Sequence, residues 1–217
     1  MRSTKIQIVK VTPPMIDLQT ARPVEELGEA GDEITGCAFA RGTVQDIHRP
    51  HISITECTFD HATFAACNFK GIELTDVRFD HCDLSNNAFD NAVLYRVEFV
   101  GCKLLGTNFA DTAFNQVHMT GCNCQYINLS ENKMRACRFT DCDFTAGSLG
   151  DCRLQSVAFE RCRMTETDFS QTTLMGIDLR TSQIAGIRLN LKDLRGAVIT
   201  PSQSIDLVSL LGVVVEG

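Results

Sequence analysis

Three acidic residues recur every 20 positions in the middle of the chain, at Asp111, Glu131 and Asp151. Asp90 lies close to the same series, and we expect it on the same face. If the fold brings residues 20 apart into register, the three carboxylates stack and repel one another. Such repulsion lowers stability unless a counter-cation or a basic partner uses it. The series therefore predicts either a solvated acidic face or an acidic stripe that imitates a phosphate backbone.

Two Asp-His pairs recur at the same interval, Asp60-His61 and Asp80-His81. Two histidines and two aspartates on adjacent turns could ligate a metal ion. Duplication of a repeat unit produces the same ladder without a ligand, so we favour a solvated surface, with no metal and no cofactor.

Both intervals are multiples of a five-residue period that extends from Ile34 to Leu194. A large apolar residue occupies nearly every fifth position, a smaller residue stands two positions before it, and only Arg49 and, in part, Cys124 interrupt the series. A helix needs apolar residues every 3.6 positions and a half-buried strand needs one every second position, so neither element fits. A chain that runs extended, turns a corner and runs extended again does fit.

Four five-residue sides make a 20-residue coil, and the sequence contains columns at that interval. A five-fold repeat with equivalent sides would not produce them. Because a single unit cannot bury its apolar pair, the coils must stack as parallel strands about 4.8 Å apart. The two clearest columns consist of Phe39, Phe59, Phe79, Phe99, Met119, Phe139, Phe159 and Leu179, and of Cys82, Cys102, Cys122, Cys142 and Cys162.

Several units match the loose motif A-(D/N)-L-x-x, namely Cys67-Asn68-Phe69, Cys82-Asp83-Leu84, Thr107-Asn108-Phe109, Cys142-Asp143-Phe144 and Thr167-Asp168-Phe169. In this the chain resembles the pentapeptide-repeat family over about three quarters of its length. The resemblance implies an all-β solenoid, a right-handed quadrilateral parallel β-helix. We also expect an α-helix at the carboxyl terminus.

Ten of the eleven cysteines occupy the small inward position, and Cys124 occupies the large one. Cysteine behaves as a small apolar residue at such sites. Neighbours in the cysteine column lie within disulfide range by Cα distance, but their side chains should point the same way. No C-x-x-C pair with a second pair downstream supports zinc. We expect buried, reduced thiols, with disulfides or a metal as the alternatives, and therefore a reducing, cytoplasmic compartment.

The repeat divides the chain into an amino-terminal cap segment (1–33), the β-helix (34–199) and a carboxyl-terminal helix and tail (200–217). A solenoid needs its open end covered, and the first segment is expected to cover it. Alternation over residues 5–11 predicts a short strand there, and residues 25–33 an acidic loop. The first segment lacks the apolar core of a signal peptide, and no stretch is long enough to span a membrane.

The carboxyl-terminal helix is expected to begin at Thr200, which is followed by Pro201 at the first helical position and by Gln203 at the third. Gly212 is expected to end it, and residues 213–215 to add a short strand. Its apolar residues are too many for one coil to cover, which favours a homodimer over a simple lid. The expected interface residues are Leu207, Val208, Leu210 and Leu211.

Two asparagines and two charged residues stand at inward positions of the repeat. We expect Asn87 and Asn132 to hydrogen-bond turn backbones inside the core, because an unpaired buried amide is costly. Lys192 is expected to mark the fraying end of the coil, and Arg49 a local bulge.

The net charge of −7 argues against nucleic acid or anionic lipid as a direct partner. Residues 51–130 hold nine acids against four bases, whereas residues 131–200 hold nine acids against ten bases, so the negative charge is concentrated in the first half of the repeat. No G-x-S-x-G motif, phosphate-cradling glycine loop or cleft-forming insertion is present, and we expect no enzyme.

An uninterrupted pentapeptide coil, a carboxyl-terminal helix with a valine-rich tail and an acidic rod together resemble the quinolone-resistance subgroup of the family. That resemblance implies a dimeric rod that imitates duplex DNA, binds DNA gyrase or topoisomerase IV, and protects the enzyme from quinolones or peptide toxins. The alternative is a general protein-interaction scaffold of the same fold with no topoisomerase role.

Overall fold

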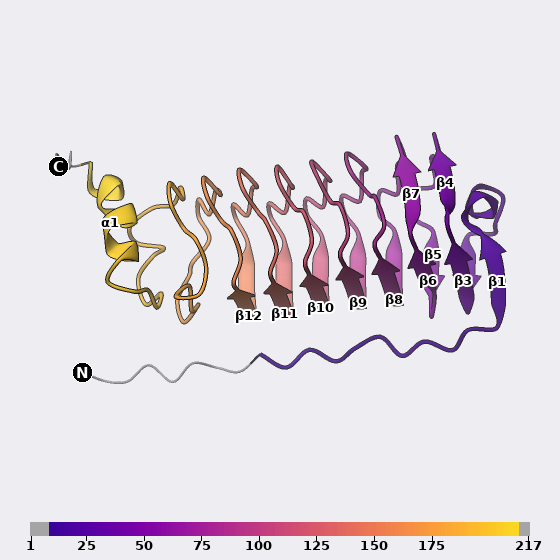
Figure 1. The fold of residues 1–217 in the computed structure, drawn as a ribbon, viewed down its shortest axis with the longest axis horizontal. Helices are drawn as coiled ribbons and strands as arrows, with labels where there is room; N and C mark the ends of the chain where they lie inside the picture. Colours follow the sequence, from indigo (N-terminus) through magenta and orange to yellow (C-terminus); the bar gives the residue numbers. More distant parts are fainter. Residues whose placement is uncertain (1–8, 213–217) are drawn as a thin grey trace.

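The computed structural model describes residues 9–212 and shows coils stacked into a rod (Figure 1). The strands are β1 (Thr20–Pro23), β2 (Glu33–Thr35), β3 (Cys37–Ala40), β4 (Gly42–Gln45), β5 (Ser53–Thr55), β6 (Thr58–Asp60), β7 (Ala62–Ala65), β8 (Glu73–Asp80), β9 (Val93–Val100), β10 (Ala113–Thr120), β11 (Lys133–Thr140) and β12 (Arg153–Glu160). The helices are the 3-10 turns η1 (Val24–Gly28) and η2 (Ser209–Leu211), and α1 (Gln203–Val208).

The 20-residue register predicted from the sequence is the register of the sheet. Every strand pair within residues 9–212 is parallel, and Phe79 pairs with Phe99, which in turn pairs with Met119. The phenylalanine rings of this column stack with centroids 4.8 to 5.1 Å apart. The large residues of the period are buried almost without exception from Ile34 to Ile184. The expected fold, a right-handed quadrilateral parallel β-helix with a carboxyl-terminal α-helix, is confirmed.

The small inward position follows one hydrogen-bonding rule along the rod. Where this residue is a cysteine, threonine, serine or asparagine, its side chain in most coils donates to the carbonyl oxygen of the large residue 23 positions earlier, as from the Cys102 thiol to Phe79 (3.5 Å) and from the Thr107 hydroxyl to Leu84 (2.9 Å). Thiols, hydroxyls and an amide therefore donate equivalent hydrogen bonds in different coils. All eleven cysteines are buried and free.

The two inward asparagines differ. Asn87 bonds as expected, because its Oδ1 accepts from the Cys67 N–H (2.6 Å) and its Nδ2 donates to the Phe64 carbonyl (2.8 Å). Asn132 accepts from the Thr112 N–H (2.7 Å), but its buried Nδ2 has no protein partner. The expectation for Asn132 is thus met only on the oxygen side.

The corners of the coils lie two residues after the large residues, and nearly all of them have positive φ values. Glycine is absent from most of them: Asp111 has φ 52°, Glu131 64° and Asp151 55°. A left-handed conformation costs an ordinary residue about 1–2 kcal/mol, and the bonds between coils offset that cost. The N–H of each corner residue donates to the coil that follows, as from Asp111 to Ser130 (2.9 Å). Corner side chains consequently stack in outward columns 20 residues apart.

The amino-terminal segment contains two parts, only the second of which covers the end of the rod. Residues 9–19, which we call the strap, run along the side of the rod toward β1 (Figure 1), and they contain no strand. The predicted strand over 5–11 is therefore wrong for residues 9–11, and residues 5–8 lie outside the described part of the chain. The end of the rod is covered by β1 and η1 of the same segment, with Val24 and Leu27 buried. β1 pairs with β3 at an offset of 17 residues, from Thr20 to Cys37, so it lies outside the repeat frame.

The acidic loop expected at residues 25–33 contains η1 and the start of β2, and Arg49 connects it to the rod. Arg49 makes no bulge; the Arg49 N–H keeps its inter-coil bond to Asn68 (2.9 Å). Its guanidinium donates to four backbone carbonyls of residues 27–31, including Ala30 (2.8 Å), and to the Asp32 carboxylate (3.0 Å). The charged residue at this large inward position thus fastens the cap to the first coil.

The carboxyl-terminal helix begins as its sequence predicts. The Gln203 N–H donates to the Thr200 hydroxyl (3.2 Å), and the Thr200 N–H donates to Gln203 Oε1 (2.8 Å), which is a reciprocal capping box. Gln203 Nε2 also donates to the carbonyls of Leu179 and Ser182, so the cap is bonded to the last coils. Lys192 is exposed in a stretch of turns, and the strand expected at 213–215 lies outside the described residues.

Candidate functional site

The acidic column consists of Asp111, Glu131 and Asp151 on three consecutive coils. All three side chains stand on left-handed corners and are exposed. The sequence interval therefore brings them into register, as predicted. Within residues 9–212, none of the three carboxylates forms an ion pair, whereas acids such as Asp83, Asp141 and Asp143 do. The column is thus a line of like charges without bound counter-charges.

Two bases lie beside the acidic column. Lys133 and Arg153, which begin β11 and β12, line an open hollow of about 510 Å³ together with the three acids. At the far end, Gln171 Nε2 donates to Asp151 Oδ2 (3.1 Å). The hollow therefore carries three negative and two positive charges at its wall, and its acidic character is confined to the column itself.

Asp90 does not extend the column. The corner one coil before Asp111 belongs to Asn91, and Asp90 precedes it. The Asp90 carboxylate pairs with Lys70 Nζ (3.2 Å) and accepts from Asn91 Nδ2 (3.1 Å). Of the four acids expected on this face, the structure stacks three and neutralises the fourth.

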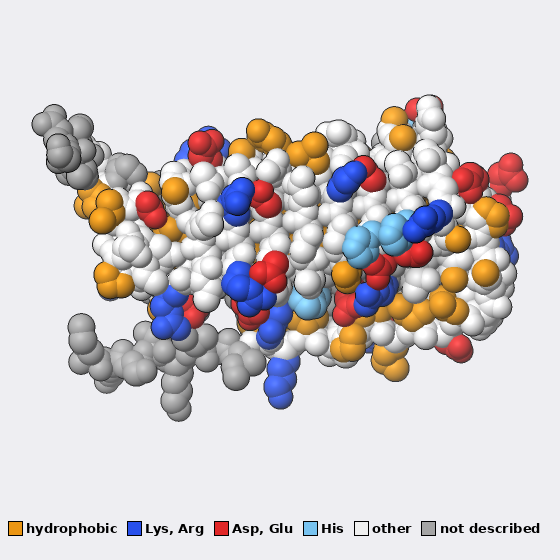
Figure 2. All heavy atoms as spheres, in the orientation of Figure 1, with side chains coloured by type: hydrophobic (Ala, Val, Ile, Leu, Met, Phe, Trp, Pro, Cys, Tyr) orange, Lys and Arg blue, Asp and Glu red, His pale blue; other side chains and the backbone are white. Residues whose placement is uncertain are grey.

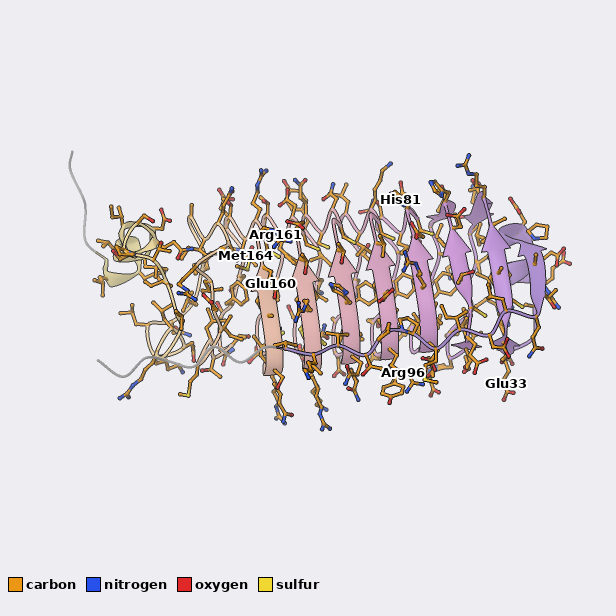
Figure 3. The ribbon with its side chains drawn as sticks, turned by 60° about the horizontal axis from the view of Figure 1, so that its bottom comes forward. Glu33, His81, Arg96, Glu160, Arg161 and Met164 are labelled. Atoms are coloured by element: carbon orange, nitrogen blue, oxygen red, sulfur yellow. The ribbon has the colours of Figure 1, made fainter. Side chains whose placement is uncertain are left out.

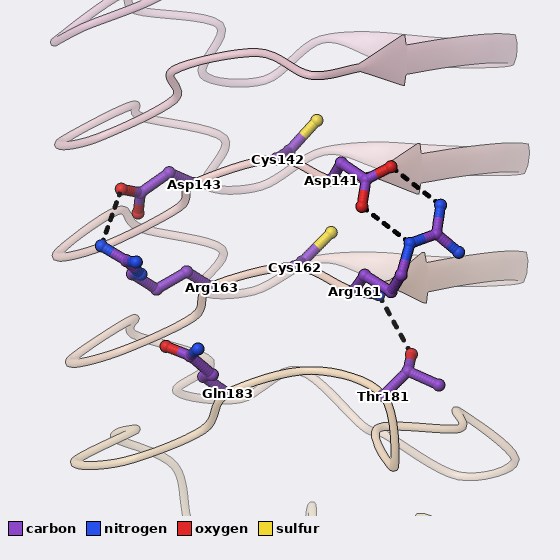
Figure 4. A pocket seen from close by; sticks show the side chains of 8 residues that line it. All are labelled: Asp141, Cys142, Asp143, Arg161, Cys162, Arg163, Thr181 and Gln183. Atoms are coloured by element: carbon purple, nitrogen blue, oxygen red, sulfur yellow. Dashed lines mark hydrogen bonds and ion pairs between the residues drawn. The ribbon is translucent and has the colours of Figure 1, made fainter.

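A second set of stacked corners and their neighbours has the opposite composition. We call it the paired ladder; it contains Asp141 above Arg161 and Asp143 above Arg163 (Figure 4). Arg161 donates from Nε and one Nη to the two carboxylate oxygens of Asp141 (2.7 and 2.8 Å). These bonds lower the pKa of Asp141 and raise that of Arg161. Arg163 reaches Asp143 at 3.7 Å.

The two Asp-His pairs also stack as expected. The rings of His61 and His81 lie parallel with centroids 5.1 Å apart, and each Nδ1 is hydrogen-bonded to the preceding aspartate, at 2.7 Å for Asp60 and 2.5 Å for Asp80. Next in that column is Gly101, where a Cβ would meet the His81 ring at 2.8 Å. In the part of the chain that the structure describes, no group of three His, Cys, Asp or Glu side chains is placed to hold a metal ion.

Figure 2 shows how the charges spread over one face of the rod. Acidic and basic side chains stand in mixed small clusters there, with the histidines among them, and no broad acidic field is visible. Asp80, for example, is shared by Arg78 (2.8 Å) and His81, and Arg78 also bonds Glu98 (3.0 Å). Unneutralised columns are therefore local features of this surface.

Sequence reasoning missed a buried ion pair under the strap. Asp76 is only 3% exposed; it is bonded by Arg96 of the next coil through two guanidinium nitrogens and by the Met15 N–H (2.8 Å). Burial raises the pKa of Asp76, but the hydrogen bonds from Arg96 and Met15 outweigh burial and leave it below its usual value. The available signal was the opposite charge of two residues 20 apart.

The four residues predicted for a dimer interface do not share one environment. Leu207 is buried against the core of its own rod, which corrects its assignment to a surface open for a partner. Val208 and Leu210 are half-buried, and Leu211 is 60% exposed. Ile205, which was not predicted, is 67% exposed beside them. In residues 9–212, no helix is long and apolar enough to cross a membrane.

Parallel strands paired at an interval of 20 residues define the class of parallel β-solenoids. The repeat itself places the chain within that class. A profile described as the pentapeptide repeat region matches residues 72–140 and 127–189, and a profile of eight pentapeptide repeats matches residues 53–86. The chain belongs to the pentapeptide-repeat proteins.

Solved structures of this fold resemble the chain at low sequence identity. A trypsin-treated variant of QnrB1, a plasmid-mediated fluoroquinolone resistance protein, is 19% identical with a TM-score of 0.49, over 94% of this chain and 98% of the other. Full-length QnrB1 is 17% identical with a TM-score of 0.42, over 79% and 100% of the chains. HetL, involved in heterocyst differentiation regulation in the cyanobacterium Nostoc sp. strain PCC 7120, is 9% identical with a TM-score of 0.34, over 81% and 92%. No curated protein matches. Likenesses this distant carry no argument about function.

Proposed function

We propose that this chain imitates duplex DNA, binds DNA gyrase or topoisomerase IV, and protects the enzyme from quinolones or related toxins. The observation that carries the proposal is the acidic column of Asp111, Glu131 and Asp151, three exposed carboxylates in register without a bound base. A surface that grips DNA is basic, and a line of unneutralised carboxylates complements it. The proposed partner places the protein in the cytoplasm.

In this proposal two copies of the chain join through the carboxyl-terminal helix. Support comes from Leu211 and Ile205, whose apolar side chains are 60% and 67% exposed at the end of the rod. Val208 and Leu210 complete the proposed interface, while Leu207 fixes α1 to its own coil. The division into a cap (1–33), a β-helix (34–199) and a dimerising helix and tail (200–217) is part of the same proposal.

A second candidate function is a general protein-interaction scaffold with no topoisomerase role. The mixed charge of the face in Figure 2 favours it, because most acids there are neutralised by a neighbouring base. A surface of paired charges offers specific contacts but little long-range attraction for a DNA-binding groove.

The test compares gyrase binding by the wild-type chain and by the triple variant Asp111→Asn, Glu131→Gln, Asp151→Asn. A matched control removes three exposed or half-exposed acids outside the column, with Asp46→Asn, Glu56→Gln and Glu73→Gln. The column variant should bind more weakly, with a shallower salt dependence, and the control should stay closer to wild type. Equal binding by all three chains removes the column as the contact surface.

Gyrase supercoiling in the presence of ciprofloxacin tests protection itself. The wild-type chain should restore supercoiling and the column variant should restore less. A wild-type chain that neither binds gyrase nor changes supercoiling rejects the topoisomerase role and leaves the scaffold.

A further inference from the structure

The strap is held to the rod through its backbone at three evenly spaced points. The Val9 carbonyl accepts from Arg138 on β11, the Thr12 N–H donates to Gln116 Oε1 on β10 (2.7 Å), and the Met15 N–H donates to Asp76 on β8 (2.8 Å). Figure 3 shows the strap crossing these strands. Contacts three residues apart place the same side of the strap against the rod.

That spacing matches a polyproline II helix on this solenoid. Pro13 and Pro14 have a fixed φ, and a residue before proline is restricted to extended or polyproline II conformations. Three residues of such a helix advance about 9.3 Å, and two coils span about 9.6 Å. Gln116 and Asp76 are two coils apart, so the advance from Thr12 to Met15 matches the distance between their partners. Arg138 lies only one coil from Gln116, and it bonds Val9 through its side chain.

The face under the strap is preformed and contacts the strap mainly through its backbone. Val9, which is only 4% exposed, is the strap's one buried apolar side chain. Asp76 retains both bonds from Arg96 if the Met15 N–H leaves, so the buried carboxylate does not depend on the strap. The side chain of Met15 is 66% exposed and that of Leu18 is 47% exposed, so these apolar groups add little to docking. Three hydrogen bonds set against the conformational entropy of an ordered segment make a reversible contact.

The surface also offers more than the strap uses. Tyr95, which lies beside Arg96 with the guanidinium 4.2 Å from the ring centroid, remains 37% exposed. Past Val9, a hollow of about 340 Å³ is lined by Arg138, Val157 and Glu160, among others. A second chain could therefore take the same backbone contacts and add side-chain contacts of its own.

We propose that the face formed by β8–β11 binds an extended, proline-containing peptide segment of a partner protein, and that residues 9–19 occupy it as a displaceable intramolecular ligand. An aromatic side chain beside a row of polar groups suits a polyproline II ligand, whose backbone is free of internal hydrogen bonds. This face is separate from the acidic column, so the proposal stands without any topoisomerase role.

The first experiment measures strap opening in the full-length chain as the rate of tryptic cleavage after the exposed Lys10. Gln116→Ala removes one acceptor, and the corner tolerates alanine because Ala136, one coil on, has φ 51°. Cleavage should rise about fivefold, the effect of one hydrogen bond. Gln116→Glu keeps the acceptor oxygen and should cleave at the wild-type rate. Equal rates for all three chains overturn the proposal.

The second experiment measures capture of a fluorescent peptide with the sequence of residues 9–19. Met15→Pro in the full-length chain deletes one strap N–H and leaves the receiving face intact. That variant should bind the peptide about fivefold more tightly than the wild-type chain does. It should also bind this peptide more tightly than it binds a second peptide in which both prolines are replaced by alanine. If the strap opens but the peptide does not bind at millimolar concentration, the strap is only a clasp and the partner surface is rejected. Equal binding of both peptides rejects the polyproline requirement.

Discussion

The acidic column and the paired ladder are built on the same backbone and differ only in the charges they carry. Asp111 stands above Glu131 as Asp141 stands above Arg161, and the four corners have φ values of 52°, 64°, 54° and 53°. In the ladder the stacked residues form a bidentate ion pair, whereas in the column they repel. Ion pairing at the corners is therefore not required for the coils to stack.

The difference shows that the core and the inter-coil hydrogen bonds hold the register and leave the surface columns free to vary. Exposed ion pairs contribute little to stability, and repulsion between exposed carboxylates is screened by water and salt. A column of like charges thus lowers stability only slightly. Binding to a basic partner is enough to offset that loss. Four predictions follow this contrast from the largest effect to the smallest.

The largest effect should come from the core that the column and the ladder share. Phe99 is buried, its ring stacks on Phe79 at 5.0 Å, and it meets Phe109 edge-on at 6.2 Å. Phe99→Ala should lower the free energy of unfolding by about 3–5 kcal/mol, as measured by urea denaturation. A midpoint equal to that of the wild-type chain would show that the register does not depend on this column.

The second effect concerns the buried thiols and should appear at alkaline pH. Burial raises the pKa of Cys137 to about 12 and that of Cys152 to about 11, from 9.0. Between pH 9 and 11 the unfolded chain releases thiol protons that the folded chain keeps, so the free energy of unfolding falls as pH rises. Each such thiol contributes a slope of up to about 1.4 kcal/mol per pH unit.

The control for the thiol prediction is Cys152→Thr. Thr172 occupies the same column one coil later and donates to the Leu149 carbonyl (2.6 Å), so threonine suits the position. The variant should remain folded and lose part of the alkaline slope in denaturation at pH 8, 9 and 10. An unchanged slope would exclude Cys152 as a source of it.

The third prediction converts the acidic column into a ladder. Glu131→Arg places a base between Asp111 and Asp151 at the spacing of the Asp141–Arg161 pair. Replacing two like-charge contacts by two opposite-charge contacts should raise the free energy of unfolding by about 0.5 kcal/mol. In the same variant, gyrase binding should weaken, but less than in the amide triple variant, because the column keeps two of its three carboxylates. If the variant gains stability and still binds gyrase as tightly as the wild-type chain, the acidic column is not the gyrase-binding surface.

The smallest effect should come from breaking the ladder. Arg161→Gln removes the bidentate partner of Asp141, and glutamine suits a left-handed corner because Gln171 has φ 62°. Both charged groups are solvent-exposed, so the denaturation midpoint should shift less than in Glu131→Arg, and this small shift should shrink further as salt is added. A large, salt-dependent loss of stability would contradict the conclusion that corner charges are dispensable.

Much of the site could be predicted from the sequence because the fold is periodic. The five-residue period predicted which residues are buried, and the 20-residue interval placed Asp111, Glu131 and Asp151 in register. The same interval contains the signal for Asp141–Arg161 and Asp76–Arg96, which are opposite charges 20 apart. It also shows that Asp90 belongs one position outside the column, where Lys70 neutralises it.

Only the tertiary structure decided what happens outside the repeat. The strap reaches residues more than 100 positions away, as in the bond from Thr12 to Gln116, and no local pattern encodes that path. Arg49 interrupts the apolar series, yet its guanidinium binds the cap through backbone carbonyls. Every residue has such a carbonyl, so the sequence gives no sign of this contact. The apolar pattern of α1 predicted a helix, but only its packing separated the buried Leu207 from the exposed Leu211. The sequence by itself determined the register, because every coil buries its apolar residues at the same positions as the coil before it. The two end segments occur only once, so their conformation depends on which parts of the rod they contact.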